Sequence, residues 1–373
     1  MTEPNKASLI DIIAGARPNF MKIAPIIRAL ETSAAAGSRL RYRLVHTGQH
    51  YDARMSGEFF TQLGIPEPDV NLEVGSGTQA EQTAAIMMGY ERLLLEERSS
   101  LCLVVGDVTS TMACAIAAQK LLVPVAHVEA GIRSGDWAMP EEINRMVTDA
   151  ITNYFFTTSE IANENLRRGG VAEERIFFVG NTMIDTLLAN LGRLTAPAIW
   201  SEIGLRAGNY FVLTLHRPAN VDAEDSLAAL LAAVGHGARA LPVVFPVHPR
   251  TATTLKGIAD LPNNLHIVEP QPYLEFNFLV KNAKAVITDS GGITEETTVM
   301  GVPCMTLRTT TERPETVTVG TNELLGTDPA ALAPAFSRLF AGSWKRGAIP
   351  DKWDGRTGER IVDILERLPL AEK

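Results

Sequence analysis

The sequence predicts a doubly wound α/β protein built from two Rossmann-like halves. Short apolar runs of strand length alternate with helical patterns, which is typical of parallel sheets whose crossovers are helices. The first series of runs comprises residues 9–13, 42–46, 101–105, 123–128, 154–157 and 176–179. The second series comprises residues 210–215, 241–247, 265–268, 285–288 and 302–307. The 373 residues also exceed the ~250 to 300 at which a single core stops growing, so two domains are expected.

The join between the halves is predicted near residue 180. Asn181 or Thr182 can cap a helix that begins directly after the last strand of the first half. We therefore expect an N-terminal domain over residues 1–180 and a C-terminal domain over residues 181–357. The tail, from about 358 to 373, carries apolar residues in a helical pattern, and packing back on the first domain would bury them.

The composition is that of an ordinary globular enzyme, with 46% apolar and 21% charged residues. The net charge of -9 disfavours the phosphate backbone of nucleic acid as the main partner. No apolar run precedes the first strand, and no segment reaches the ~18 consecutive apolar residues of a spanning helix. Neither a signal peptide nor a membrane anchor is therefore expected.

The three cysteines, Cys102, Cys114 and Cys304, lie in apolar or Ala-rich segments. They lack the paired spacing of a metal site, so we expect buried thiols in a reducing compartment and no bound metal. The sequence thus favours a cytoplasmic protein.

Three carboxylates cluster in the stretch from residue 104 to residue 145. Asp107 and Glu129 come just past two predicted strands, and Glu141 follows a Pro-bearing loop. The Ala-rich segment 109–120, with its Ser/Thr start, predicts a crossover helix packed tightly on the sheet. Because open α/β sheets bind ligands at the carboxyl ends of their strands, these acids are expected in one crevice. Helix caps or surface charges are the alternative interpretation.

A glycine-rich turn in the second half predicts an anion site. Neither half contains GxGxxG or GxxxxGK[ST], so no nicotinamide cofactor is indicated. Instead, Ser290, Gly291 and Gly292 follow a predicted strand and begin a helix, whose N-terminus and backbone amides favour a pyrophosphate. Glu296 lies at the beginning of that helix, where it could accept hydrogen bonds from ribose hydroxyls or act only as a cap.

Cationic residues stand at comparable turns. Arg17 and Lys22 follow the first predicted strand, and Arg313 lies in a polar loop, so we expect a diphosphate to be held between the domains. His216 follows the strand at 210–215 and faces the same predicted crevice. It is either a structural hydrogen-bonding residue or part of the chemistry.

Ten short motifs of this sequence, taken together, resemble those of one known family. In chain order they are GARPNFMK (15–22), HTGQHYD (46–52), GD (106–107), HVEAG (127–131), PEEINR (140–145), GNT (180–182), HRP (216–218), PVH (246–248), DSGGI (289–293) and TERPE (311–315). In order and spacing they resemble the non-hydrolysing UDP-N-acetylglucosamine 2-epimerases, over nearly the whole chain. The resemblance implies the GT-B fold, in which two Rossmann-like parallel-sheet domains face a central cleft.

The resemblance also implies roles for particular residues. The catalytic acids would be Asp107, Glu129 and Glu141, with His216 beside them. The UDP contacts would fall on Arg17, Lys22, Gln271, Phe276, Ser290, Gly291, Gly292, Glu296 and Arg313. From the residues alone, Gln271 would belong to a turn and Phe276 would be a core aromatic. A homodimer, a UDP-sugar substrate and no cofactor are implied as well.

The chemistry of the family explains why one crevice would hold several acids. Its members eliminate UDP to give 2-acetamidoglucal and then add UDP back, so the C2 proton leaves from one face and returns to the other. One carboxylate cannot easily serve both faces. UDP departs as an anion, which cationic side chains and the amides at 290–292 would stabilise. The sequence does not say which acid is the base and which the proton donor.

The first loops depart from the family pattern. Asn19 stands where better-known bacterial members have Glu, and Tyr51 and Asp52 also differ. Some members bind a second UDP-sugar as an activator, through residues that match Gln49, His50, Arg217 and His248. This chain keeps all four, but the charge of Asp52 predicts that a second anionic sugar binds poorly.

The leading hypothesis is a 2-epimerase that makes UDP-N-acetylmannosamine for cell-surface polysaccharide. The same chemistry on a modified sugar, such as a UDP-diacetamido-uronate, is the close alternative. A GT-B glycosyltransferase and a nucleotide-sugar sensor without turnover are alternatives from other classes. A transferase needs an acceptor and no proton chemistry at C2, and a sensor needs neither.

Overall fold

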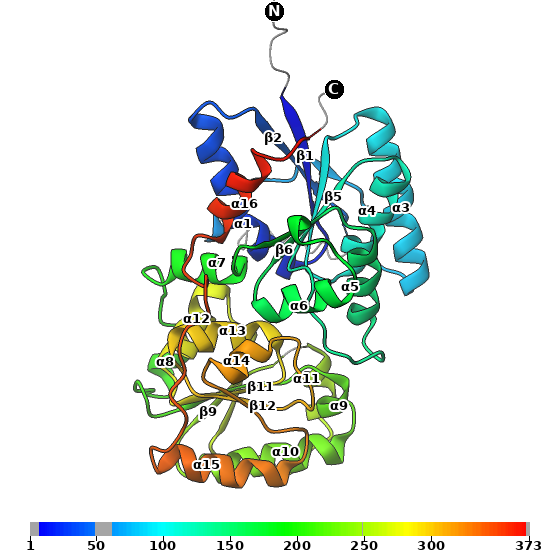
Figure 1. Cartoon of the computed structure of the whole chain (residues 1–373). Coiled ribbons are helices and arrows are strands. Elements are labelled where there is room, and N and C mark those ends of the chain that lie inside the picture. Colours follow the sequence, from blue (N-terminus) through cyan, green and yellow to red (C-terminus); the bar gives the residue numbers. More distant parts are fainter. Residues whose placement is uncertain (1–6, 49–61, 248, 371–373) are drawn as a thin grey trace, which may run out of the picture. The chain divides into compact units, whose positions relative to one another are not determined.

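The computed structural model describes residues 7–48, 62–247 and 249–370. It divides into two compact units (Figure 1). The first unit comprises Met1–Ala189 together with Asp351–Lys373, and the second comprises Asn190–Pro350.

The first unit is built on a parallel sheet whose described strands number seven, in the order β3-β2-β1-β4-β5-β6-β7. The strands are β1 (Ser8–Ala14), β2 (Leu40–His46), β3 (Val70–Asn71), β4 (Leu101–Val105), β5 (Val125–Val128), β6 (Tyr154–Thr157) and β7 (Ile176–Phe178). Every residue of β4 and β5 is buried, as expected of central strands covered on both faces. Their sequences are therefore nearly continuous apolar runs.

Helices connect these strands. They are α1 (Arg17–Ala35), α3 (Gln79–Glu96), α4 (Thr109–Lys120), α5 (Pro140–Ile151), α6 (Glu160–Arg168), the 3-10 helix η1 (Glu173–Arg175) and α7 (Thr182–Asn190). α4 has the bounds that the sequence predicts, and its small Ala, Ser and Thr side chains are largely buried between the sheet and its neighbours α3 and α5. The predicted cap of α7 is confirmed, because the Asn181 side chain accepts a hydrogen bond from the backbone N–H of Met183.

The end of the chain completes the first unit. α16 (Thr357–Leu365) packs on α1, where the red and dark blue helices lie side by side in Figure 1. The two helices approach each other closely at Gly358, because a side chain there would begin 2.5 Å from the carbonyl oxygen of Pro25 in α1. The buried Trp353 donates its indole N–H to the carbonyl of Thr158 at 3.1 Å. The tail thus covers apolar surface of the first unit.

The second unit repeats the plan with a parallel sheet of six described strands, in the order β10-β9-β8-β11-β12-β13. The strands are β8 (Phe211–Thr214), β9 (Val243–Pro246), β10 (Leu265–Val268), β11 (Ala285–Thr288), β12 (Cys304–Thr306) and β13 (Asn322–Leu324). The helices are α8 (Ala198–Glu202), α9 (Pro218–Val221), α10 (Glu224–Gly237), α11 (Pro249–Leu255), α12 (Tyr273–Asn282), α13 (Gly291–Met300), α14 (Pro314–Thr318), the 3-10 helix η2 (Pro329–Ala331) and α15 (Leu332–Phe340).

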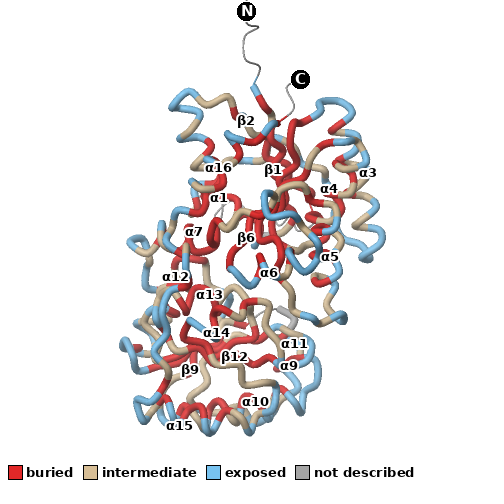
Figure 2. Tube along the Cα trace, viewed as in Figure 1, coloured by how far each residue is buried: buried red, intermediate tan, exposed pale blue. Residues whose placement is uncertain are grey.

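Buried residues concentrate on the strands and on parts of the helices around them (Figure 2). In the second unit one large cluster joins Phe211 and Phe245 of the central strands to Phe336 of α15. In the first unit a cluster joins Val104 of β4 to Cys114 of α4 and Tyr90 of α3. The three cysteines are buried thiols, as the sequence predicts. Burial raises the pKa of the Cys304 thiol to about 11, so it stays protonated.

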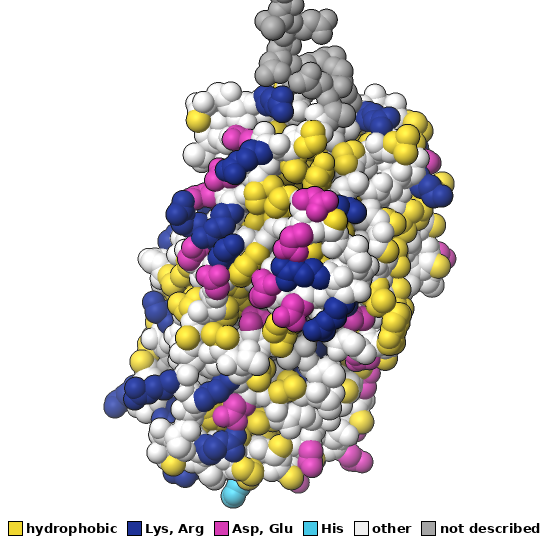
Figure 3. All heavy atoms as spheres, in the orientation of Figure 1, with side chains coloured by type: hydrophobic (Ala, Val, Ile, Leu, Met, Phe, Trp, Pro, Cys, Tyr) yellow, Lys and Arg dark blue, Asp and Glu magenta, His cyan; other side chains and the backbone are white. Residues whose placement is uncertain are grey.

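The surface carries both signs of charge. On the face shown in Figure 3, Lys and Arg side chains are interspersed with Asp and Glu side chains. None of the helices in the described ranges is long and apolar enough to cross a lipid bilayer.

Candidate active site

Several of the predicted site residues follow the strands at which the strand order of each sheet reverses. The strand order turns around between β1 and β4 in the first unit and between β8 and β11 in the second. Such switch points leave a crevice at the carboxyl ends of the strands, where open α/β sheets bind ligands. Asp107 follows β4 in the first unit, and His216 follows β8 in the second.

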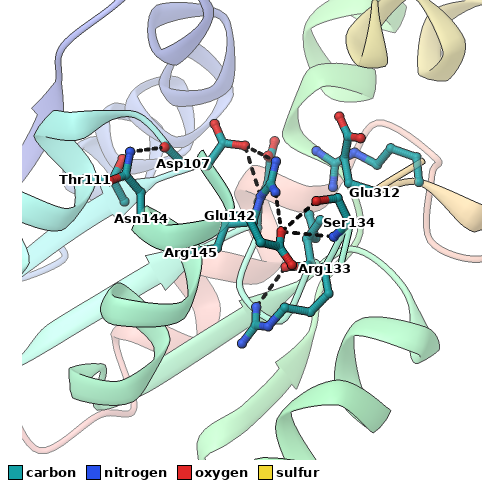
Figure 4. Close-up of polar contacts among 12 residues, drawn as sticks. Asp107, Thr111, Arg133, Ser134, Glu142, Asn144, Arg145 and Glu312 are labelled. Atoms are coloured by element: carbon teal, nitrogen blue, oxygen red, sulfur yellow. Dashed lines mark hydrogen bonds and ion pairs between the residues drawn. The ribbon is translucent and has the colours of Figure 1, made fainter. Parts of the chain in front are cut away.

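Asp107 is held by two residues of α5 (Figure 4). The guanidinium of Arg145 donates to Oδ2 of Asp107 at 2.6 and 3.1 Å, and the amide of Asn144 donates to the backbone carbonyl of Asp107 at 2.9 Å. The Asp107 side chain keeps 28% of its surface exposed, while that of Arg145 keeps 4%. A buried cation therefore fixes one oxygen of an acid that solvent or a ligand can still reach.

The carbonyl just before Asp107 is held as well. Gly106 has a positive φ of 67°, and its oxygen lies 2.8 Å from Nε2 of the fully buried His127. The other ring nitrogen of His127, Nδ1, lies 2.7 Å from Oδ1 of Asp149. Both ring nitrogens thus face acceptors.

Asp149 anchors this network. Its Oδ2 accepts from the backbone N–H of Gly131 at 3.0 Å and from Arg133 at 2.6 Å. Burial opposes ionisation of Asp149, but the hydrogen bonds and charges of His127 and Arg133 outweigh it and lower its pKa.

Glu129 is the most deeply placed of the predicted acids. It follows β5, is 3% exposed and adopts a φ of 69°, which is uncommon for a residue with a side chain. Its Oε2 lies 2.7 Å from Nζ of Lys22 in α1. A side chain at Gly106 would begin 2.8 Å from the same Nζ, so the glycine leaves room for Lys22. In this structure the predicted UDP contact Lys22 is paired with a predicted catalytic acid.

The two adjacent glutamates of α5 have different environments. Glu141 lies half-buried in the first turn of the helix. Glu142 is buried and accepts from the backbone N–H groups of Ser134 and Gly135, both at 3.0 Å, and from Arg145 at 2.6 Å. Burial opposes its ionisation, but these donors together lower its pKa. Glu142 therefore holds the loop before α5. Glu141 is the more exposed of the two glutamates, and it remains the candidate for a catalytic role.

In the second unit, His216 and Asp289 follow the adjacent strands β8 and β11. Nδ1 of His216 lies 2.8 Å from Oδ1 of Asp289. The carboxylate is fully buried, whereas the imidazole is 45% exposed. Burial opposes ionisation of Asp289, but hydrogen bonds from His216, Asn220 and the backbone of Arg217 lower its pKa.

The glycine turn forms the beginning of α13, as predicted. Ser290 is the N-cap residue, and its backbone N–H donates to Oγ1 of Thr288 at 3.0 Å. A Cβ at Gly291 would lie 2.6 Å from Oε1 of Glu312, so a side chain there would require the Glu312 carboxylate to shift. Gly291 and Gly292 are the first residues of the helix and are only partly buried, and glycines at a helix N-terminus suit an anion.

Glu296 lies one turn further along α13 and is 4% exposed. Burial raises its pKa to about 7, although hydrogen bonds from Asn277 and Tyr273 oppose the shift. The amide of Asn277 stands 3.4 Å from its Oε1. Glu296 thus has a pKa near neutrality one turn from the predicted anion site.

The remaining predicted contacts of the second unit are more dispersed. Nε of the buried Arg313 pairs with Glu295 of α13 at 2.5 Å. Gln271 and Phe276 are partly buried. The side-chain amide of Gln271 donates to the carbonyl of Glu269 at 2.7 Å. Phe276 packs on a hydrophobic cluster that includes Val280. Arg217 donates through Nε to the carbonyl of Asp289 at 3.0 Å. Gln49, His50, Asp52, His248 and the side chain of Arg17 lie outside the described residues.

The sequence predictions missed the residues that hold the acids. Arg145 lies in the PEEINR motif, but nothing in the motif says that it reaches Asp107, 38 positions earlier. The pairing of His127 with Asp149 joins a strand to the following helix in the same way. Asp289 does have a local signal, because it is a charged residue directly after a buried strand. No cluster of His, Cys, Asp and Glu that could hold a metal ion occurs in the part of the chain that the structure describes.

The two parallel-sheet units match solved epimerase structures of the GT-B class. A solved structure of the UDP-GlcNAc 2-epimerase of Methanocaldococcus jannaschii, in complex with UDP-GlcNAc and UDP, has a TM-score of 0.84 at 41% identity, covering 96% of this chain and 99% of that one. The model of the UDP-N-acetylglucosamine 2-epimerase family matches residues 33–366. The chain belongs to this family of isomerases.

Individual relatives differ in their named substrates. The chain is 42% identical to the UDP-N-acetylglucosamine 2-epimerase of Methanocaldococcus jannaschii over 95% of its length and 98% of the relative. It is 40% identical to the UDP-2,3-diacetamido-2,3-dideoxy-D-glucuronate 2-epimerase of Pseudomonas aeruginosa over 95% of its length and 99% of the relative. A UDP-GlcNAc 2-epimerase of Neisseria meningitidis, solved bound to UDP-GlcNAc, has a TM-score of 0.86 at 26% identity, covering 97% of this chain and all of that one.

Proposed function

We propose that this protein interconverts UDP-N-acetylglucosamine and UDP-N-acetylmannosamine. The observation that carries the proposal is that each of two strand-end acids in the first unit has its own cation. Asp107 is paired with Arg145, and Glu129 with Lys22. Two separately positioned carboxylates suit a reaction that removes a proton from one face of a carbon and returns it to the other.

The proposed reaction is an elimination followed by an addition. One carboxylate takes the proton from C2, the C–H electron pair forms the C1=C2 bond, and the C1–O bond breaks with its electron pair leaving on UDP. A second acid then gives a proton to the opposite face of C2 while the UDP oxygen bonds again to C1. Asp107, Glu129 and Glu141 are the candidates for both roles.

The second unit is proposed to hold UDP. Ser290, Gly291 and Gly292 would receive the diphosphate, and Glu296 would accept from the ribose hydroxyls, an assignment that the open helix end and the burial of Glu296 support. Gln271, Phe276, Arg313, Arg17 and Lys22 are proposed as further contacts by their match to the family motifs. Positive groups near the departing phosphate would stabilise the charge that develops as the C1–O bond breaks.

The test is product analysis without any acceptor. The purified protein is incubated in deuterated water with UDP-N-acetylglucosamine, and NMR follows the configuration and deuterium content of C2. We expect both C2 epimers, each carrying deuterium at C2, because the removed proton exchanges with solvent. Transfer of the sugar to an added acceptor without exchange at C2 would favour a glycosyltransferase, and neither exchange nor product would favour a sensor.

A second candidate substrate is a UDP-2,3-diacetamido-uronate, because a relative at 40% identity is named for that sugar. The chemistry at C2 would be the same. Comparing kcat/KM for the two UDP-sugars in the same NMR assay separates the candidates. A preference for the uronate of more than about 10², which a single well-placed charged contact can produce, would replace the leading assignment.

A homodimer, a cytoplasmic location and a role in polysaccharide precursor synthesis are also proposed. The first unit offers an apolar surface for self-association, since a cavity of about 580 Å³ between α3, α4 and α5 is lined by Trp137 and Ile143, which are 65% and 44% exposed. Light scattering after size exclusion would measure the mass of the wild type and of Trp137→Glu. A monomeric wild type would contradict the dimer.

A further inference from the structure

Asp289 organises the turn that carries His216. Its Oδ2 accepts from three donors: the backbone N–H groups of His216 and Arg217 at 3.1 and 3.0 Å, and the side-chain amide of Asn220 at 3.0 Å. Its Oδ1 faces Nδ1 of His216 at 2.8 Å. Oδ1 also shares the backbone N–H of His216 with Oδ2, at 3.2 Å. Oδ2 therefore holds the backbone of the turn together with Asn220, and Oδ1 is the oxygen that faces the imidazole.

This contact determines which nitrogen of His216 is available. An ionised carboxylate only accepts hydrogen bonds, so Nδ1 must carry the hydrogen. Asp289 is fully buried and the imidazole is 45% exposed, so the opposite nitrogen, Nε2, lies at the exposed end of the ring. A carboxylate in this position also stabilises the charged ring when Nε2 is protonated.

Asp289 also joins His216 to the glycine turn. It directly precedes Ser290, the N-cap residue of α13, and its carbonyl accepts from Nε of Arg217 at 3.0 Å. The strands on either side are in register, with Thr214 of β8 opposite Thr288 of β11. The imidazole and the proposed diphosphate cradle are therefore fixed to the same buried residue.

We propose that Asp289 is a positioning residue of the epimerase reaction, which holds His216 with Nε2 turned toward the diphosphate that leaves from C1 and returns to it. The proposal rests on the proposed function. His216 contacts the departing phosphate through Nε2, and Asp289 acts only through His216. No proton moves to Asp289, which stays a carboxylate throughout.

The variant Asp289→Asn tests the proposal because its outcome follows from the geometry. The three donors at the Oδ2 position need an acceptor, so the single amide oxygen of Asn is expected there. The NH₂ group then takes the place of Oδ1 and donates to Nδ1 of His216, which leaves the hydrogen of the neutral ring on Nε2. The substitution thus reverses the tautomer of His216 with little change in shape.

Two measurements separate positioning from a purely structural role. Long-range proton–nitrogen NMR at about pH 8.5, where a histidine ring is ordinarily neutral, should show His216 with Nδ1–H in the wild type and Nε2–H in Asp289→Asn. The kcat should fall by about 10² or more, as carboxylate-to-amide changes next to catalytic histidines do, while the Kd for UDP changes less than about 3-fold.

Asn220→Ala is the matched control. It removes one donor from Oδ2 but leaves the contact between Oδ1 and Nδ1, so it should lower the unfolding midpoint while the tautomer stays as in the wild type and kcat changes less than about 3-fold. An Nε2–H tautomer in the wild type, or an unchanged kcat in a folded Asp289→Asn, would overturn the proposal. If the wild type turned over no UDP-sugar, the proposed function would fail, whereas the tautomers of the two proteins would still decide whether Asp289 positions His216.

Discussion

Nζ of Lys22 lies 2.7 Å from Oε2 of Glu129, although the two residues are 107 positions apart in the chain. Both side chains are largely buried, at 11% and 2% exposure. Glu129 also has a positive φ of 69°, which a residue with a side chain adopts only at some cost. The contact with Lys22 therefore holds an acid with a strained backbone in place at the end of β5.

Replacing Lys22 by Met should destabilise the first unit. The substitution buries Glu129 without this cation, and removing one partner of a buried pair typically costs about 3 to 5 kcal/mol. Urea unfolding of the single variants and of the double variant Lys22→Met/Glu129→Gln gives the coupling energy. We expect the double variant to recover part of the loss, and Lys120→Met, at an exposed site in α4, to cost less than about 1 kcal/mol. Additive losses would mean that the pair contributes nothing to stability.

Amide substitutions test the catalytic acids directly. Asp107→Asn, Glu129→Gln and Glu141→Gln should each lower kcat by a factor of at least ~10², the low end for lost acid–base catalysis, with the affinity for UDP largely kept. Glu91→Gln, on the exposed surface of α3, is the control and should leave kcat unchanged. Near-normal turnover in all three variants would remove the acids from the mechanism.

Glu296 predicts a pH dependence of the second unit's stability. Its folded pKa of about 7 lies above the ordinary 4.5, so the folded protein holds a proton that the unfolded chain releases. The stabilisation is fully present below about pH 4.5 and is lost as the pH rises through about 7, by about 3 kcal/mol in all.

Glu296→Gln imitates the protonated acid and should not show this loss. Urea unfolding without UDP is expected to give a variant more stable than the wild type at about pH 8.5 and of similar stability at about pH 5. The exposed Glu269→Gln should follow the wild type at both values. A constant difference between Glu296→Gln and the wild type would mean that the acid is ionised throughout this range.

The sequence predicted the positions of the acids because those signals are local. β4, α4 and β5 are apolar or Ala-rich elements joined by short turns, so Asp107 and Glu129 had to follow two neighbouring strands. The strand bounds were less accurate. The run at 123–128 forms a strand only over Val125–Val128, since Pro124 before it has no N–H to donate to a ladder. The very short β3 and β13 had no recognisable pattern.

The contacts around the acids were beyond prediction for a physical reason. His127 and Arg145 meet the Gly106–Asp107 turn through side-chain directions that depend on how β5 and α5 pack. Periodicity reports which face of an element is buried, but it does not report which polar groups meet there. His216 had two open interpretations for the same reason, because its partner Asp289 is 73 positions away.

Regulation by a second UDP-sugar gives a kinetic prediction. Asp52 follows Gln49 and His50 closely in the sequence, and we expect its negative charge to disfavour a second anionic ligand that binds through them. Rate against substrate concentration should be hyperbolic, and the reaction from UDP-N-acetylmannosamine alone should begin without a lag. Asp52→Asn would then be the variant that gains activation. A sigmoidal curve or a lag in the wild type would show that the activator is bound despite Asp52.

His127 is fully buried and contacts the turn before Asp107, so its replacement should affect both stability and turnover. Its Nε2 lies 2.8 Å from the carbonyl oxygen of Gly106 and its Nδ1 lies 2.7 Å from Oδ1 of Asp149, so both contacts end when the imidazole is replaced. In His127→Leu the carbonyl of Gly106 and one oxygen of Asp149 lose buried donors, which should cost about 3 kcal/mol or more in urea unfolding. Where the variant stays folded, kcat should fall more than KM changes, because the loosened turn carries Asp107. The exposed His236→Leu in α10 should change stability by less than about 0.5 kcal/mol. Equal stability of His127→Leu and the wild type would show that the buried network does not fix the turn.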